Sequence, residues 1–151
     1  MNVIALVGCG KSKLTVPAPA KDMYTGSLFR AARGWAERKA DQWAILSAQY
    51  GLIEPDREIK PYSYRLAKKD AQQWGVCIVN NLRYRFGKGP FHLVLLAGVD
   101  YADPVAEEIT KRMEFDGFAN TCVISKPLAY LQLGERLAWF KKERLAETSR
   151  A

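Results

Sequence analysis

Residues 3–13 have the sequence VIALVGCGKSK, in which an apolar run passes directly into a turn rich in glycine and lysine. The run at residues 3–7 is rich in β-branched and aliphatic side chains and predicts a buried strand. Gly8 and Gly10 leave the backbone free to turn, and Lys11 and Lys13 add positive charge. Ligands of open α/β sheets bind just beyond the carboxyl ends of strands. The stretch therefore predicts an α/β fold with an anion-binding turn at a strand end.

The same stretch contains the tripeptide GKS but does not match the nucleotide-binding P-loop. That pattern, G-x-x-x-x-G-K-[ST], requires a glycine at the position of Ala5, in the middle of the predicted strand. Pro17 and Pro19 follow too soon for a helix to begin directly after the turn. We therefore predict a different phosphate pocket, with a solvated glycine-rich turn as the alternative. The four residues of the predicted pocket are Gly10, Lys11, Ser12 and Lys13.

Strand-like and helix-like segments alternate along the chain. Further strands are predicted at residues 43–48, 91–97 and 121–124, and helices at 27–39, 67–86, 103–115 and 134–147. Ser27 and Asp103 are the predicted caps of two of these helices. The alternation predicts a single α/β domain over residues 1–151, with a mostly parallel central sheet between two layers of helices. Right-handed crossovers would bring the carboxyl ends of the strands to one edge.

Composition favours an anionic partner. The chain has 151 residues, with 23 Lys and Arg against 16 Asp and Glu, a formal net charge of +7 and a pI near 9.4. We expect a nucleotide or nucleic acid, with DNA favoured over RNA. No leader or membrane-spanning run is evident, so a cytoplasmic location is expected and no membrane partner. Three cysteines without metal-like spacing and a single histidine predict no metal site, and we predict no cofactor.

The predicted sheet edge collects polar side chains from four strand ends. They follow the strands at residues 9–13, 47–50, 100–101 and 125–126. If the sheet is parallel, these segments share one cleft that suits a base or sugar stacked on a ring, with a phosphate on the lysines. The residues predicted to bind a base or another part of the substrate are Tyr24, Ser47, Gln49, Tyr50, Gly51, Tyr62 and Tyr101.

Two residues are predicted to be catalytic. Asp100 would act as a general base, or as a carboxylate that stabilises the cationic sugar formed when an N-glycosidic bond breaks. Cys9 would be a nucleophile whose thiol is activated by the neighbouring lysines. The structural alternatives are that Asp100 caps a turn and that Cys9 is a small buried side chain. The tyrosines would equally serve as partial core.

Two further segments carry a resemblance to a known family. Residues 45–55, ILSAQYGLIEP, continuing to IKPY at 59–62, are similar to the signature of the YaaA-type peroxide-stress proteins. Upstream, YTGSLF at residues 24–29 is similar to that family's F-x-G-x-x-Y element. The CGKSK of residues 9–13 resembles small phage and bacterial relatives, which are more distantly similar to base-modification enzymes and to the uracil-DNA glycosylase class of α/β folds. The resemblance covers about residues 22–66 and implies a nucleic-acid or nucleobase context.

These observations support three hypotheses. The first is an enzyme that processes a nucleotide or nucleic-acid base, cleaving at the N-glycosidic bond. The second is a non-catalytic DNA-binding protein of the oxidative-stress response, as the resemblance implies. The third is an accessory protein whose pocket has lost its chemistry.

Overall fold

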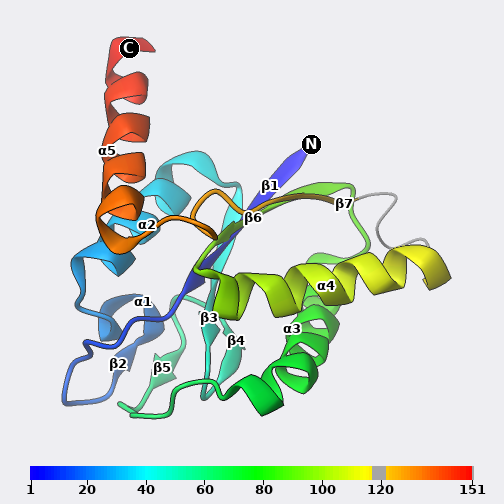
Figure 1. Cartoon of the computed structure of the whole chain (residues 1–151). Coiled ribbons are helices and arrows are strands. Elements are labelled where there is room, and N and C mark those ends of the chain that lie inside the picture. Colours follow the sequence, from blue (N-terminus) through cyan, green and yellow to red (C-terminus); the bar gives the residue numbers. More distant parts are fainter. Residues whose placement is uncertain (117–121, 151) are drawn as a thin grey trace.

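The computed structural model describes residues 1–116 and 122–150 and is built on a five-stranded sheet of order β4-β3-β1-β6-β7 (Figure 1). The strands are β1 (Asn2–Gly8), β3 (Gln42–Ser47), β4 (Gly51–Ile53), β6 (Phe91–Leu96) and β7 (Cys122–Ser125). β1 pairs in parallel with β3 and β6, and β6 pairs in parallel with β7. β4 runs antiparallel to β3. The predicted mixed α/β fold with a mostly parallel sheet is confirmed.

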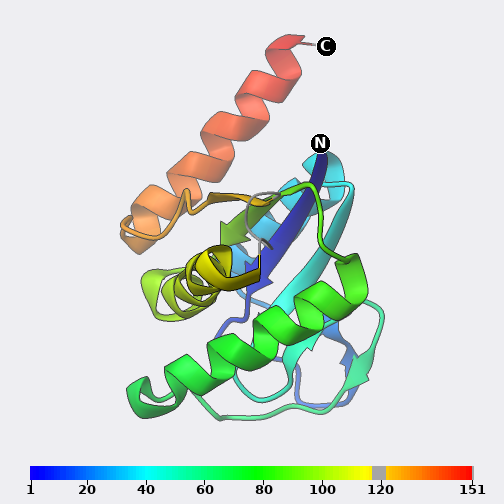
Figure 2. The ribbon, with the colours of Figure 1, turned by 90° about the vertical axis from the view of Figure 1, so that its right-hand side faces the viewer.

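Helices follow most of the strands. They are α1 (Ala20–Met23), α2 (Ser27–Lys39), α3 (Ala71–Phe86), α4 (Val99–Asp116) and α5 (Leu133–Arg150). A 3₁₀ helix (Lys68–Asp70) precedes α3, and the short strands β2 (Ala18–Pro19) and β5 (Glu58–Ile59) pair with each other. α2 lies beside α5 and α3 beside α4, and Figure 2 shows the far end of α5 extending beyond the rest of the chain.

No helix within the described residues combines the length and the apolar character needed to cross a membrane.

The apolar core consists of two clusters that meet at the sheet. Ile4 and Leu6 of β1 belong to the cluster that includes residues of α3 and α4. Ala5 and Val7 belong to the cluster that includes residues of α2 and α5. Successive side chains of a strand point to opposite faces, so the central strand is covered on both. This is why residues 3–7 are uniformly apolar, as expected of a buried parallel strand.

The predicted start of the helix at residues 103–115 is wrong. α4 begins at Val99, four residues before the proposed cap, because the carbonyl of Gly98 already accepts hydrogen bonds from the backbone N–H groups of Tyr101 (3.1 Å) and Ala102 (2.9 Å). Asp103 therefore lies inside the helix. Its carboxylate accepts a hydrogen bond from Lys126 Nζ at 2.9 Å instead of capping the helix.

Smaller differences affect other elements. The N-cap of α2 is Gly26 rather than Ser27, which is the first helical residue, and no side chain caps this helix. β4 was not predicted; Gly51, with φ of 74°, reverses the chain so that it pairs back onto β3. The predicted strand at 121–124 corresponds to Cys122–Ser125, and Thr121 lies outside the described residues. α5 continues to Arg150, beyond the predicted end.

Candidate functional site

A cavity of about 560 Å³ lies beyond the carboxyl ends of β1 and β6. Gly8 and Cys9 border it at the end of β1, and Ala97 and Gly98 border it after β6. The chain leaves β1 for β3 on one side and later returns to β6 on the other side, so the cavity sits where the strand order reverses. Both its size and its place in the sheet are typical of small-molecule sites.

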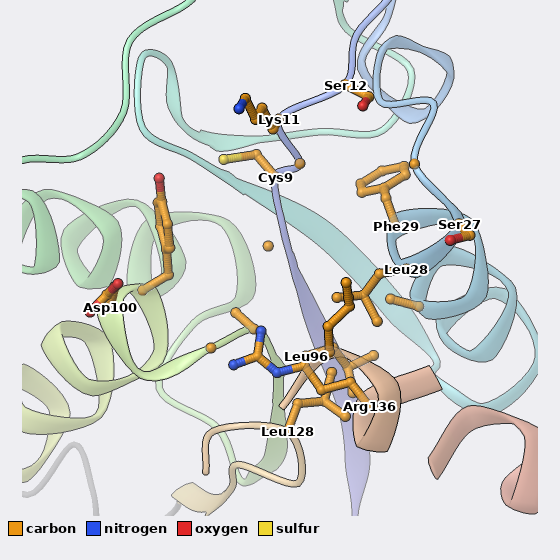
Figure 3. Close-up of a pocket in the computed structure, with 18 of the residues that line it drawn as sticks. Cys9, Lys11, Ser12, Ser27, Leu28, Phe29, Leu96, Asp100, Leu128 and Arg136 are labelled. Atoms are coloured by element: carbon orange, nitrogen blue, oxygen red, sulfur yellow. The ribbon is translucent and has the colours of Figure 1, made fainter. Parts of the chain in front are cut away.

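One wall of the cavity is apolar. Figure 3 shows Leu28 and Phe29 of α2 on the opposite side of the cavity from Asp100 of α4. Leu96 and Leu128 complete this wall. Phe29 and Leu128 are buried, so the wall is part of the fixed core rather than a mobile surface. It is suited to the flat face of a base or to another apolar group.

The amino ends of two helices point their backbone at the same cavity. Gly26 and Ser27 at the start of α2, and Gly98 and Val99 at the start of α4, are all lining residues. The first N–H groups of a helix have no partner within the helix, and α2 has no side-chain cap to supply one. Such N–H groups and the helix dipole favour a negatively charged ligand.

Three cations and one carboxylate line the cavity. Lys11, Arg65 and Arg136 carry positive charge, and Asp100 is the one carboxylate among the described lining residues. Arg65 Nη2 lies 3.9 Å from Asp100 Oδ2, but their side chains are 86% and 65% exposed, so this ion pair is weak. Both groups are therefore available to a ligand at little cost.

Arg136 of α5 is held by a hydrogen bond to the segment before this helix, and it lies close to a glycine. Its Nε donates a hydrogen bond to the carbonyl of Leu131 at 2.8 Å. A Cβ atom at Gly98 would come within 2.7 Å of Arg136 Nη2, so the glycine makes room for the guanidinium. Figure 3 shows the Arg136 side chain reaching into the cavity between the apolar wall and α4.

A second cavity of about 520 Å³ adjoins the first. The two share Cys9, Gly10, Lys11, Arg65 and Tyr101 as lining residues. The second adds Lys13, Ser63 and Tyr64, and no carboxylate is among its described lining residues. We name the two together the β1–β6 site: it has an apolar end on α2 and a cationic end on Lys11, Lys13 and Arg65.

Tyr101 stands at the junction of the two cavities. Its ring packs edge-on against Trp74, with ring centroids 5.4 Å apart, and its hydroxyl accepts a hydrogen bond from the backbone N–H of Leu66 at 3.5 Å. Burial, with a further contribution from Cys9, raises the pKa of Tyr101 to about 12. The hydroxyl therefore stays protonated at neutral pH and can donate a hydrogen bond to a ligand.

Three residues predicted to contact substrate form a hydrogen-bonded cluster whose members line neither cavity. The hydroxyl of Tyr62 lies 2.7 Å from that of Tyr24 and 2.8 Å from Ser47 Oγ. Ser47 Oγ also accepts hydrogen bonds from the backbone N–H groups of Gln49 (3.2 Å) and Tyr50 (3.0 Å). Ser47 is 0% exposed and lines neither cavity, so the structure does not bring it to the residues around the two cavities. We call Tyr24, Ser47 and Tyr62 the hydroxyl cluster.

Other predicted residues support the turn after β3. The ring of Tyr50 packs against Tyr62 at 5.6 Å, and its hydroxyl accepts a hydrogen bond from the backbone N–H of Lys60 at 3.3 Å. Gln49 is exposed at the turn, and Gly51 supplies the positive φ that the turn requires. Tyr50, Gln49 and Gly51 do not line either cavity of the β1–β6 site.

The end of β7 contributes nothing to the site either. Ser125 Oγ lies 2.6 Å from His92 Nε2, and Lys126 donates to Asp103. Only two of the four strand ends that were expected to converge do so among the described residues, those of β1 and β6. The side chains that have partners within the fold at the ends of β3 and β7 are those of Ser47, Tyr50, Ser125 and Lys126, and none of them lines either cavity.

The sequence did not indicate the role of Arg136 or of the apolar wall. Arg136 reaches the site because residues 126–132 bring the start of α5 back to the sheet edge, which no local pattern predicts. Leu28 and Phe29 belong to YTGSLF, the segment noted for its family resemblance, and that signal was available. Cys9 is free and partly exposed, and no group of three metal-ligating side chains occurs among the described residues.

A family model with the description "Family of unknown function (DUF6884)" matches residues 4–142. The chain belongs to this DUF6884 family. It is also 32% identical over 62 residues to the uncharacterized protein YfjM of Bacillus subtilis (strain 168), an alignment that covers 37% of this chain and 41% of that protein. The chain thus spans about two fifths of the curated relative it matches. No solved structure matches the chain significantly. The resemblance of this DUF6884 member to YaaA-type proteins stays a prediction.

Proposed function

We propose that the β1–β6 site binds a nucleotide, free or within a nucleic acid, and that the protein cleaves the N-glycosidic bond between its sugar and base. One observation carries the proposal: an apolar wall, a cationic end and a lone carboxylate border one continuous site. A nucleotide has a flat base for the apolar wall, a phosphate for the cations and a sugar between them. The site's position at the reversal of strand order supports the same class of ligand.

The phosphate would lie at the cationic end. Lys11 and Arg65 border both cavities, and their ammonium and guanidinium groups form charge-assisted hydrogen bonds with phosphate oxygens. The base would then lie between Phe29 of α2 and Tyr101 of α4, which both line the cavity.

Asp100 is the group that we propose assists bond cleavage. When the bond between the sugar C1′ and the base nitrogen breaks, the base keeps the electron pair and takes up a proton, and positive charge develops on the sugar. A water oxygen bonds to C1′ and releases a proton. An ionised Asp100 would stabilise the sugar cation or accept the proton of the water. Both roles require the carboxylate, so they share one test.

The test is Asp100→Asn. We expect base release from nucleoside 5′-monophosphates and from oligonucleotides, followed by chromatography, to fall at least about 100-fold. The dissociation constant for a nucleoside monophosphate should stay within about twofold, because the amide keeps the shape of the carboxyl group. Glu107→Gln is the matched control, since Glu107 is an exposed carboxylate on the same helix outside the β1–β6 site. Equal turnover by Asp100→Asn and the parent protein would overturn the role.

A second function is a non-catalytic DNA-binding protein, as the YaaA resemblance implies. Exposed basic side chains along α5, Lys141, Lys142 and Arg144, favour it. The absence of base release from every nucleotide and oligonucleotide tested, with retained DNA binding, would select this function over the first.

We also propose a finer description of the fold and its setting. The separate apolar clusters support a three-layer arrangement, with α2 and α5 on one face of the sheet and α3 and α4 on the other. Three free cysteines support a reducing, cytoplasmic location.

A further inference from the structure

A groove of about 350 Å³ runs between α2 and α5, outside the β1–β6 site. Its floor is apolar and includes Leu137 and Phe140. Its rim is basic, with Arg30 and Arg38 on α2 and Lys141 and Arg144 on α5. No carboxylate is among its described lining residues.

The basic rim is not neutralised by its surroundings. Arg38 Nε donates to Glu147 Oε2 at 2.8 Å, and Lys39 lies 4.0 Å from the other oxygen of the same carboxylate. Arg38, with smaller contributions from Lys39 and Arg144, lowers the pKa of Glu147 and keeps it ionised. One carboxylate thus faces several cations. The exposed Arg30 and Lys141 form no ion pair with any described residue and are available to an anionic ligand.

The groove continues the wall of the β1–β6 site. Leu28 and Arg136 line the site, while Ala31 and Leu137, three and one residues further along the same helices, line the groove. Arg144 is eight residues beyond Arg136, or about 12 Å along a helix. Successive nucleotides of a strand rise about 3.4 Å, so this length corresponds to a few nucleotides.

We propose that the substrate is one nucleotide of a longer polynucleotide strand, whose adjoining phosphates lie along the α2–α5 groove. This deepens the proposed function and rests on it. The target base would have to leave its stack to enter the cavity, as bases do in enzymes that act on them in nucleic acids. The apolar floor and Leu145, which is 63% exposed, offer surfaces to the neighbouring bases, while the cations bind their phosphates.

The test compares two double variants that remove the same charge. Lys141→Gln/Arg144→Gln changes the groove, and Lys68→Gln/Lys69→Gln removes two exposed lysines from the 3₁₀ helix elsewhere. All four side chains are exposed, and glutamine is a good helix former, so both variants should fold. Binding of 12-nucleotide single-stranded DNA and RNA is measured by fluorescence anisotropy between 50 and 200 mM salt, and binding of a nucleoside monophosphate by calorimetry.

We expect the parent protein to bind one of the 12-mers at least about tenfold more tightly than the monophosphate. The groove variant should lose about tenfold of that affinity, and its salt dependence should be shallower by about 1.4 in logarithmic slope, which corresponds to two lost phosphate contacts. Its affinity for the monophosphate should not change. The control variant should bind the 12-mer more tightly than the groove variant and with a steeper salt dependence.

Three results would overturn the proposal that the α2–α5 groove binds a polynucleotide strand. The first is equal affinity of the parent protein for the 12-mer and the monophosphate. The second is an equal loss of 12-mer affinity in the two double variants. The third is binding to anionic phosphatidylserine vesicles that is as tight as binding to the 12-mer and is lost in the groove variant. None of these affects base release from monophosphates or its loss in Asp100→Asn, which test the proposed function separately. Conversely, groove-dependent binding of a 12-mer without any base release would support the groove and reject the enzymatic activity.

Discussion

The hydroxyl cluster and the β1–β6 site are both polar, but they differ in whether their polar side chains have partners within the fold. In the cluster, each of the hydroxyls of Tyr24, Ser47 and Tyr62 has a partner within 2.8 Å. In the site, Lys11 is exposed, and the one ion pair to Asp100 is 3.9 Å long between mostly exposed side chains. Polar groups that satisfy one another hold a fold together, whereas polar groups left with weak partners around a cavity are available to a ligand.

The difference separates stability from binding. The cluster ties the turn after β3 to the segments at residues 24 and 62, which have no long regular element of their own. The site adds little to stability because its charges are solvated. Substitutions should therefore affect unfolding in the first region and ligand affinity in the second, and a substitution that affected both would break the comparison.

The largest expected effect is that of Ser47→Ala. It would remove the fully buried hydroxyl that the Tyr62 hydroxyl and the backbone N–H groups of Gln49 and Tyr50 share as a hydrogen-bond partner. We expect the free energy of unfolding in urea to fall by about 3 kcal/mol, since each unsatisfied buried group costs about 1–3 kcal/mol. Affinity for a nucleoside phosphate should persist where the variant is folded.

Ser12→Ala is the matched control for that variant. Ser12 is exposed and lines the cavity, so the same chemical change should alter the free energy of unfolding by less than about 0.5 kcal/mol. If the two alanine variants were equally stable, Ser47 would not be the centre of a stabilising cluster.

A smaller effect is expected in alkali. Burial raises the pKa of Tyr24 to about 12, above its unfolded value of 10. A group with a raised pKa contributes stability that is complete below pH 10 and is lost as the pH rises through 12. The loss attributable to Tyr24 should approach about 2 kcal/mol at pH 12, in urea unfolding measured from pH 8 upward. Tyr24→Phe should reduce this dependence.

Three other groups bear on the alkaline measurement, because burial also raises the pKa of Tyr101 to about 12, the pKa of Tyr62 and that of Cys122. Burial raises the pKa of the Cys122 thiol to about 11, so some stability is lost from pH 9 in every variant that retains Cys122. Tyr84→Phe is the control because the Tyr84 side chain is 90% exposed. The same pH dependence in Tyr24→Phe and Tyr84→Phe would contradict a stabilising role for the buried hydroxyl.

The sequence predicted the sheet better than the site. The strand at residues 3–7 and the helix at 27–39 follow from hydrophobic pattern and length, which are local properties. β4 was missed because a strand of three residues is too short to show a hydrophobic pattern in the sequence. Its pairing with β3 is decided by tertiary contact. The start of α4 was misplaced because Asp103 and Pro104 resemble a cap, while the Gly98 carbonyl begins the helix earlier.

The site was predicted only where it depends on the strand ends themselves. Residues 9–12 and 100–101 border the cavity because β1 and β6 are parallel neighbours, which alternation of strands and helices predicts. Ser47 and Tyr50 have the same residue types at another strand end. Whether a hydroxyl faces a ligand or a neighbouring tyrosine depends on the path of residues 60–66, which has no periodicity to guide a prediction.

The smallest predicted effect distinguishes two lysines of one turn. Lys11 is exposed and lines both cavities, whereas Lys13 Nζ lies 4.5 Å from the centre of the Tyr62 ring and donates to the Lys11 carbonyl at 3.3 Å.

Lys11→Gln should weaken binding of a nucleoside monophosphate about tenfold, or about 1.4 kcal/mol, and leave the free energy of unfolding unchanged. Lys13→Gln should weaken binding less and lower the free energy of unfolding by about 0.5–1 kcal/mol, through loss of the cation–π contact. Calorimetric titration and urea unfolding of both variants measure the two effects. Equal losses of affinity would mean that Lys13 leaves Tyr62 to bind phosphate, so that the hydroxyl cluster and the β1–β6 site act together rather than separately.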